Sequence, residues 1–263
     1  MYDLSNLEIR KKQEEVLQKI RRESAEIVQR NLMKTKRGEI GIAVTEVGYD
    51  DVGSVLTKLD YAYSVVTDND LTNYGALEKF KILFINCGTG GDPARNKESL
   101  RKFVRKGGAL YVSDQSAPQI SAAFPNIVEF SSGGIAGQSI MADVVDQDLR
   151  RIIGSHIRIY FDLSDWIPIQ QINRDVHAYL VGTFETNCGH KKDKPILISF
   201  KYEAGEVIYT SFHSHKQTSE AEEKLLKFLV LKPVSITSKI PILRLAKDKG
   251  LLALEQKDAN SLH

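Results

Sequence analysis

Residues 206–213, Glu-Val-Ile-Tyr-Thr-Ser-Phe-His, decide the fold, because a run of β-branched and aromatic residues leads into a polar cluster at 212–215. Residues of these types favour an extended strand, and this strand delivers His213 at its carboxyl end. In open α/β sheets, ligands bind outside the carboxyl ends of the strands. The stretch therefore predicts an α/β sheet with a polar site at the end of this strand.

From residue 38 onward, short apolar runs alternate with helical segments. Strands are expected at 39–45, 62–67, 81–87 and 109–114, and helices at 50–59 and 92–106. The second helix is well delimited, since Asp92 suits the N-cap, Pro93 the first turn and Gly107 the end. Strands that alternate with helices imply right-handed crossovers and a mostly parallel sheet covered on both faces.

After residue 125 the pattern becomes β-rich. Strands are expected at 140–145, 157–161, 177–184, 195–202 and 206–211, a short helix at 147–153, a hairpin loop at 187–192, and helices at 219–231 and 242–256. Ser219 and Glu222 have the spacing of a capping box. We predict a basic helical extension at 1–37, an α/β domain at 38–232 with a β-rich insertion at 126–205, and a tail at 233–263 that begins at Pro233.

Composition limits the classes of protein to consider. A net charge of +2 gives no whole-chain case for nucleic acid, although residues 8–37 hold ten Lys/Arg against five Glu. This extension is predicted to be a solvated helix, with a phosphate-binding arm that contacts nucleic acid as the alternative. Cys87 and Cys188 lack a paired spacing, and no apolar run approaches the roughly 20 residues of a membrane span. We expect a cytoplasmic protein without membrane contact.

Three expected strand ends carry polar or glycine-rich sequence, at 86–92, 113–116 and 212–215. In a parallel sheet they would meet in one crevice. The glycine loop at 87–91, the stretch 104–114 and the stretch 209–213 together resemble the class I glutamine amidotransferase-like superfamily, with the ThuA-like branch nearest in texture.

The resemblance covers about residues 38–231 and implies a flavodoxin-like three-layer sandwich. Residue by residue, it places Asp114 where glutaminases have the nucleophilic cysteine and His213 at the catalytic histidine. The 87–91 loop falls at the oxyanion loop, and His215 falls at the triad glutamate. Two of the three triad positions therefore depart from the family's enzymes.

The departure at Asp114 argues against glutaminase activity, because attack on a glutamine amide needs a thiolate and a carboxylate cannot replace it. We expect a non-catalytic binding or assembly module that contacts a protein partner or a second copy of itself. We expect no cofactor and no metal.

A hydrolase that uses Asp114 and His213 is the main alternative. A metal-assisted version would add His215, but i,i+2 side chains of an extended segment point to opposite faces, so the chain would have to turn after Phe212. Cys87 is either a displaced nucleophile or a small buried residue without reactivity.

A small anionic ligand or nucleotide is the second alternative. The backbone N–H groups of Gly88, Thr89, Gly90 and Gly91 precede a helix and could face an anion, with Gln115 and His215 beside them. The loop matches neither standard nucleotide fingerprint. The lone tryptophan, Trp166, follows two carboxylates and is either a binding lip or a packed indole. Cys188 and His190, without further ligands, do not predict a metal site.

Overall fold

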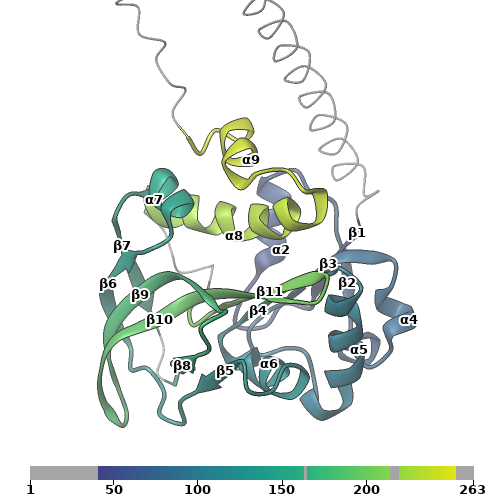
Figure 1. The fold of residues 1–263 in the computed structure, drawn as a ribbon, viewed down its shortest axis with the longest axis horizontal. Helices are drawn as coiled ribbons and strands as arrows, with labels where there is room; N and C mark the ends of the chain where they lie inside the picture. Colours follow the sequence, from purple (N-terminus) through teal and green to yellow (C-terminus); the bar gives the residue numbers. More distant parts are fainter. Residues whose placement is uncertain (1–40, 163–164, 214–218, 253–263) are drawn as a thin grey trace, which may run out of the picture.

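A nine-stranded mixed sheet organises the part of the chain that the computed structural model describes, residues 41–162, 165–213 and 219–252 (Figure 1). Its strands lie in the order β2-β1-β3-β4-β11-β10-β9-β6-β7. They are β1 (Gly41–Thr45), β2 (Ser64–Val66), β3 (Phe80–Ile85), β4 (Ala109–Ser113), β6 (Gln138–Val144), β7 (His156–Phe161), β9 (His177–Thr186), β10 (Gly189–Tyr202) and β11 (Gly205–Thr210). Neighbours from β2 to β11 are parallel and those from β11 to β7 are antiparallel.

Helices cover both faces of this sheet (Figure 1). One layer holds α2 (Val52–Lys58), α7 (Gln147–Ile153), α8 (Glu220–Ser238) and α9 (Ile242–Asp248), and the other holds α5 (Pro93–Arg105) and α6 (Ala117–Ala123). The predicted flavodoxin-like sandwich is confirmed. The region predicted as a β-rich insertion supplies β6, β7, β9 and β10, and it extends the same sheet.

Burial explains the pattern of apolar and polar residues along the strands. Every residue of β4 and β11 is buried, since parallel strands inside a sandwich are covered on both faces. In β6 and β7, buried and exposed residues alternate, because one face packs on the core while the other meets solvent. Ser113 of β4 lies opposite Thr210 of β11, so this register brings the ends of the two strands to the same edge.

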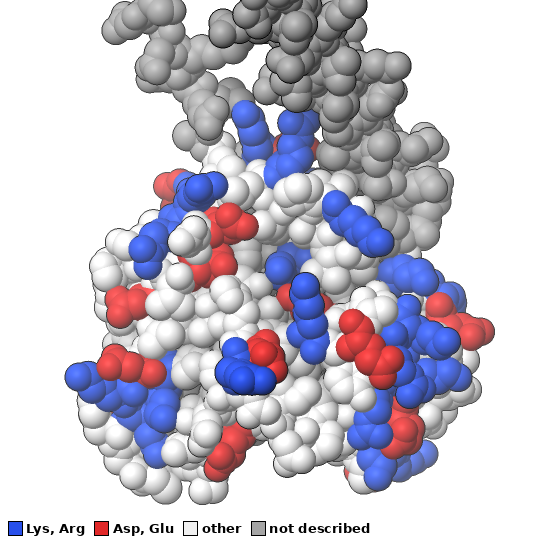
Figure 2. Space-filling model, in the orientation of Figure 1, with Lys and Arg blue, Asp and Glu red and all other residues white. Residues whose placement is uncertain are grey.

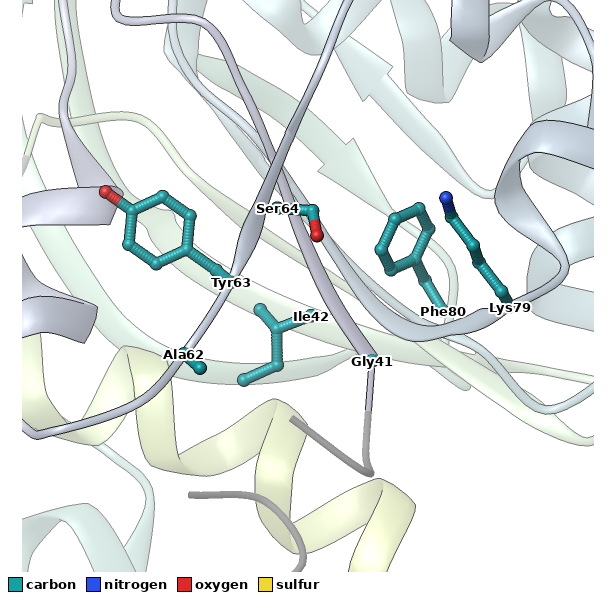
Figure 3. A pocket seen from close by; sticks show the side chains of 7 residues that line it. All are labelled: Gly41, Ile42, Ala62, Tyr63, Ser64, Lys79 and Phe80. Carbon is teal, nitrogen blue, oxygen red and sulfur yellow. The ribbon is translucent and has the colours of Figure 1, made fainter. Parts of the chain in front are cut away.

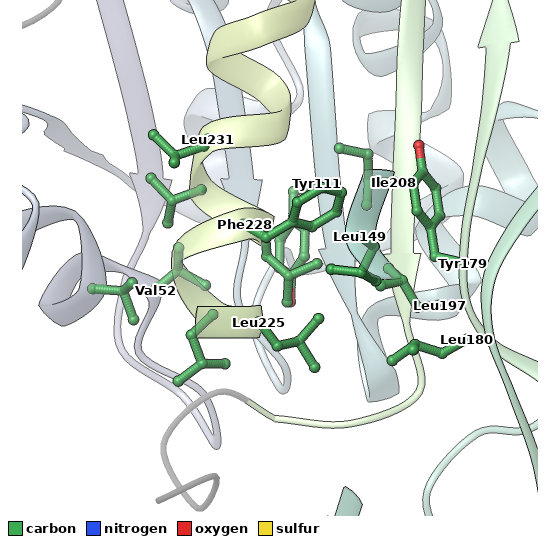
Figure 4. Close-up of a cluster of buried hydrophobic side chains, with 14 of the residues drawn as sticks. Val52, Tyr111, Leu149, Tyr179, Leu180, Leu197, Ile208, Leu225, Phe228 and Leu231 are labelled. Atoms are coloured by element: carbon green, nitrogen blue, oxygen red, sulfur yellow. The ribbon is translucent and has the colours of Figure 1, made fainter. Parts of the chain in front are cut away.

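Helix α8 packs its apolar face on the centre of the sheet (Figure 4). Phe228 lies beside Tyr111 in this view, and Leu225, Phe228, Leu231, Tyr111 and Ile208 are all almost fully buried. The predicted capping box is confirmed, because Ser219 accepts the Glu222 N–H and Glu222 accepts the Ser219 N–H.

The prediction that this helix ends at Leu231 was wrong. Pro233 lies inside α8, which runs to Ser238. A proline within a helix removes one N–H donor, and here burial of Pro233 and Val234 in the apolar core offsets that loss. The next helix, α9, is shorter than expected, and residues after 252 lie outside the described part.

Short elements escaped prediction. Strands β5 (Val128–Phe130) and β8 (Ile169–Ile172) pair with each other in a separate sheet, and α3 (Asp68–Leu71) and α4 (Tyr74–Leu77) each hold about one turn. The loop expected at 187–192 is only a tight turn, because Gly189 pairs with Thr186 and Lys191 with Phe184.

The predicted basic extension at 1–37 lies outside the described residues, and the boundaries proposed between the extension, domain and tail stay predictions. Within the described ranges, no helix combines the length and apolar character that crossing a membrane requires.

Candidate functional site

Asp114 occupies a sharp elbow between a strand and a helix. Strand β4 ends at Ser113, a 3-10 turn spans Asp114–Ser116, and α6 follows directly. The backbone of Asp114 adopts a φ of 38°, in the left-handed region that non-glycine residues rarely enter. The elbow turns the carboxylate away from the strand and toward the ends of β3 and β11.

Cys87 and His213 meet the Asp114 carboxylate from those two strand ends. Oδ2 of Asp114 lies 3.6 Å from the Cys87 sulfur and 3.2 Å from His213 Nε2. The exposed fractions of Cys87, Asp114 and His213 are 0%, 2% and 2%. The three strand ends therefore converge as predicted, but the side chains form a buried cluster, whereas the sequence predicted a crevice.

The segment 165–167 closes over this cluster. The Ile167 N–H donates to Asp114 Oδ1 at 2.6 Å, and the indole of Trp166 lies on the His213 imidazole with ring centroids 3.9 Å apart. Tyr209 donates its hydroxyl to the Ile167 carbonyl at 2.9 Å. The second interpretation of Trp166, a packed indole, describes its environment, since only 1% of it is exposed.

Ile167 and Tyr209 were not among the predicted site residues. A backbone N–H leaves no trace in sequence, so Ile167 gave no signal. Tyr209 gave a weak one, since a buried tyrosine usually needs a partner for its hydroxyl, and it stands four residues before His213 in the stretch that predicted the fold.

Burial keeps the Cys87 thiol protonated. Removal from water raises the pKa of this thiol well above its usual range, and the neighbouring Asp114 carboxylate raises it further. The Gln115 backbone N–H, which bonds the sulfur, only partly opposes these effects. A nucleophilic cysteine needs the reverse environment, one that favours the thiolate.

Polar groups of the glycine loop at 87–91 form hydrogen bonds within the protein. The Gly90 N–H donates to Asp68 Oδ1 at 2.8 Å, and the Gly90 carbonyl accepts from Gln119 Nε2 at 2.8 Å. Thr89 bonds the Asn86 carbonyl through its hydroxyl at 2.7 Å. Gly88, at a φ of 78°, leaves no room for a Cβ against the Tyr49 ring. These contacts fix the loop against α3 and α6.

Two further residues were predicted to bind a ligand, Gln115 and His215. The Gln115 side chain is exposed and donates to the Asp165 carbonyl. His215 lies outside the described residues. Cys188 is exposed in the β9–β10 turn.

Two hollows open away from Asp114. One, of about 300 Å³, lies at the amino end of β1, where Tyr63, Lys79 and Phe80 contribute to its wall (Figure 3). The other, of about 410 Å³, holds the Lys232 ammonium 3.5 Å from the Glu206 carboxylate. Glu206 begins the pairing of β11 with β4, so this second hollow lies at the opposite end of these strands from His213.

Lys and Arg side chains gather along α5, with acidic side chains among them (Figure 2). Arg101 pairs with Glu98 at 2.9 Å and donates to the Ala123 carbonyl. The Lys102 ammonium lies 4.3 Å from the centre of the Tyr74 ring. Part of this basic surface thus attaches α5 to α4 and α6.

Comparisons with known proteins show similarity in fold. No family model and no curated protein matches it. A ThuA-like protein from Bacteroides uniformis shares the fold with a TM-score of 0.56 at 11% identity, over 74% of this chain and 91% of that one. A protein from Thermoplasma acidophilum, described as a GMP synthase component, gives 0.55 at 12% identity, over 80% and 98%.

The mmIFT52 N-terminal domain gives a TM-score of 0.55 at 13% identity, over 74% of this chain and 97% of that domain. The chain thus has a glutamine amidotransferase-like fold that ThuA-like proteins share. Identities this low show the fold alone.

Proposed function

We propose that the protein is a non-catalytic binding or assembly module built on a glutamine amidotransferase-like fold. The observation that carries the proposal is the Asp114 carboxylate at the elbow, buried with Cys87 and His213 beneath Trp166. A nucleophile must reach its substrate, and this carboxylate is bonded to the protein through both oxygens. Support also comes from Cys87, since its raised pKa disfavours the thiolate.

The outer face of β6 and β7 is the contact surface that we propose. Met141 and Tyr160 are 65% and 44% exposed on it, which is high for large apolar side chains. Asp143 and His156 pair on the same face at 2.8 Å. Strand β7 also ends the described sheet, so its outer edge meets no further strand there.

A second copy of this chain fits such a surface. An edge strand presents unpaired backbone groups that another strand can satisfy, and two copies of β7 related by a two-fold axis would run antiparallel. The face carries apolar side chains together with charges of both signs, which suits pairing with itself.

Sedimentation velocity on the full chain tests this proposal. We expect a dimer for the wild type and a monomer for the double variant Met141→Glu, Tyr160→Glu. Val47→Glu is the matched control, because Val47 is 70% exposed but follows β1, near the other end of the sheet; this variant should stay dimeric. A monomeric wild type, or a double variant that stays dimeric, contradicts the proposed surface. If only the deletion of residues 1–36 dissociates the dimer, the contact lies in the extension and not on β6 and β7.

A hydrolase is the second candidate, because Asp114 and His213 lie within hydrogen-bond reach at 3.2 Å, as a catalytic pair requires. Hydrolysis of an amide or ester by the wild type, lost in both Asp114→Ala and His213→Gln variants that remain folded, would favour it over the module.

A further inference from the structure

We infer that Cys87, Asp114 and His213 form a binding site for one divalent transition-metal ion, with zinc the best match. The ligand-capable atoms of these three side chains lie within 4.8 Å of one another. They come from the ends of three adjacent strands, β3, β4 and β11. This set differs from the metal-assisted alternative predicted from the sequence, which combined Asp114 and His213 with His215, a residue outside the described part of the chain.

The distances suit a tetrahedral ion. Zinc bonds of about 2.0–2.3 Å place neighbouring ligand atoms roughly 3.3–3.6 Å apart. The separations of Asp114 Oδ2 from the Cys87 sulfur and from His213 Nε2, 3.6 and 3.2 Å, are close to that range. The third edge, from imidazole to sulfur, spans at most 4.8 Å, so it closes with a shift of at most about 1.2–1.5 Å.

The chemistry of the ligands selects the class of metal. Sulfur, imidazole nitrogen and a single carboxylate oxygen suit zinc and its neighbours, whereas calcium and magnesium require oxygen ligands. Binding of the ion would displace the Cys87 thiol proton to solvent. The resulting thiolate and the Asp114 carboxylate would together neutralise the divalent charge, since an uncompensated charge in a buried site is costly. Exposed groups of acidic residues are common on proteins that bind no ion there, whereas the three residues of this cluster are all buried.

Surrounding contacts orient two of the ligands, as functional metal sites require. The Ile167 N–H holds Asp114 Oδ1, which leaves Oδ2 directed at the other two ligands. The Trp166 indole packs against the His213 ring and fixes its plane. The ion would therefore join three strand ends and, through Asp114 and His213, hold the 165–167 segment against them.

The test measures metal directly on the full chain. Protein produced with added zinc and passed through gel filtration should carry about one zinc per chain by mass spectrometry. Cys87→Ser should lose at least nine-tenths of that metal. Cys188→Ser is the matched control, because it removes the chain's other cysteine, which is exposed, and it should keep the metal.

Cobalt gives a second measurement that does not depend on zinc carried through purification. Cobalt added to metal-free wild type should produce a thiolate-to-cobalt absorption band and quench Trp166, the chain's only tryptophan; Cys188→Ser should behave in the same way. Circular dichroism establishes that each variant is folded. If Cys87→Ser does not fold, the decision rests on the cobalt band of the wild type and Cys188→Ser.

Less than about a tenth of an ion per chain in the wild type, with no cobalt band, overturns the inference. So does zinc that Cys87→Ser retains or that Cys188→Ser loses. The metal site rests on the proposed function in one respect only, namely that the ion has a structural and not a catalytic role. If the protein binds no metal and hydrolyses no substrate, only the metal site is contradicted. If it binds metal and also hydrolyses a substrate, the non-catalytic role is contradicted and the metal site stands.

Discussion

The backbone N–H of Ile167 lies 2.6 Å from Asp114 Oδ1, and this contact joins two parts of the chain that are 53 residues apart. Asp114 belongs to the parallel half of the sandwich, whereas Ile167 belongs to the region predicted as a β-rich insertion. The Asp114 carboxylate therefore anchors the segment that covers the buried cluster.

Replacing Asp114 should destabilise the fold. Asp114→Ala leaves the Ile167 N–H without its acceptor, and losing a hydrogen bond to a charged group costs about 1.5–3 kcal/mol. Asp114→Asn retains a side-chain oxygen and should cost less. Urea unfolding measures both, with Asp175→Ala as the exposed control. An Asp114→Ala protein as stable as the control would show that the contact stabilises nothing.

Truncating Trp166 should have a larger effect. Its indole is 1% exposed and packs on both His213 and Phe161. Trp166→Ala should lower the free energy of unfolding by about 3–5 kcal/mol, since it leaves a large cavity. Trp166→Phe should lower it less. Thermal denaturation followed by circular dichroism compares them, and equal midpoints for the two variants would argue against tight packing at this position.

Tyr61 should make the fold sensitive to alkaline pH. Burial raises the pKa of this tyrosine from 10.0 to about 12, so the folded state holds its proton more tightly than the unfolded state. Its contribution is complete below pH 10 and is lost as pH rises toward 12, by about 1.4 kcal/mol per unit. Tyr61→Phe should flatten this loss in urea unfolding measured across pH. The exposed Tyr49→Phe should not, and an unchanged slope in Tyr61→Phe would contradict the prediction.

Lys232 and Glu206 should be energetically coupled in the second hollow. Their side chains are mostly buried, at 21% and 10% exposure, and 3.5 Å apart. Lys232→Met and Glu206→Gln each leave the other charge poorly compensated. The double variant should therefore lose less stability than the sum of the two single losses, by about 1 kcal/mol in a double-mutant cycle. Additive losses would mean that the pair does not interact.

The parallel half of the fold could be predicted because its signals are local. Asp92 and Pro93 at the start of α5, the capping box at Ser219 and the apolar runs of β4 and β11 each act over a few residues. The meeting of Asp114 with His213 followed from the rule that parallel strands end at one edge.

Other features depend on contacts distant in sequence and could not be predicted. The closure of the site by Trp166 depends on how residues 165–167 return to the sheet. The path of α8 through Pro233 depends on burial against the core, which overrides the local tendency of proline to end a helix. Strands β5 and β8 are too short to show a period.

The most direct test of the non-catalytic proposal is ammonia release from glutamine by the purified full chain. We predict a rate equal to that of buffer alone, and the same rate for Asp114→Asn, because the elbow residue Asp114 is a buried carboxylate, whereas attack on a glutamine amide needs a thiolate. Release above background that Asp114→Asn abolishes would contradict the account.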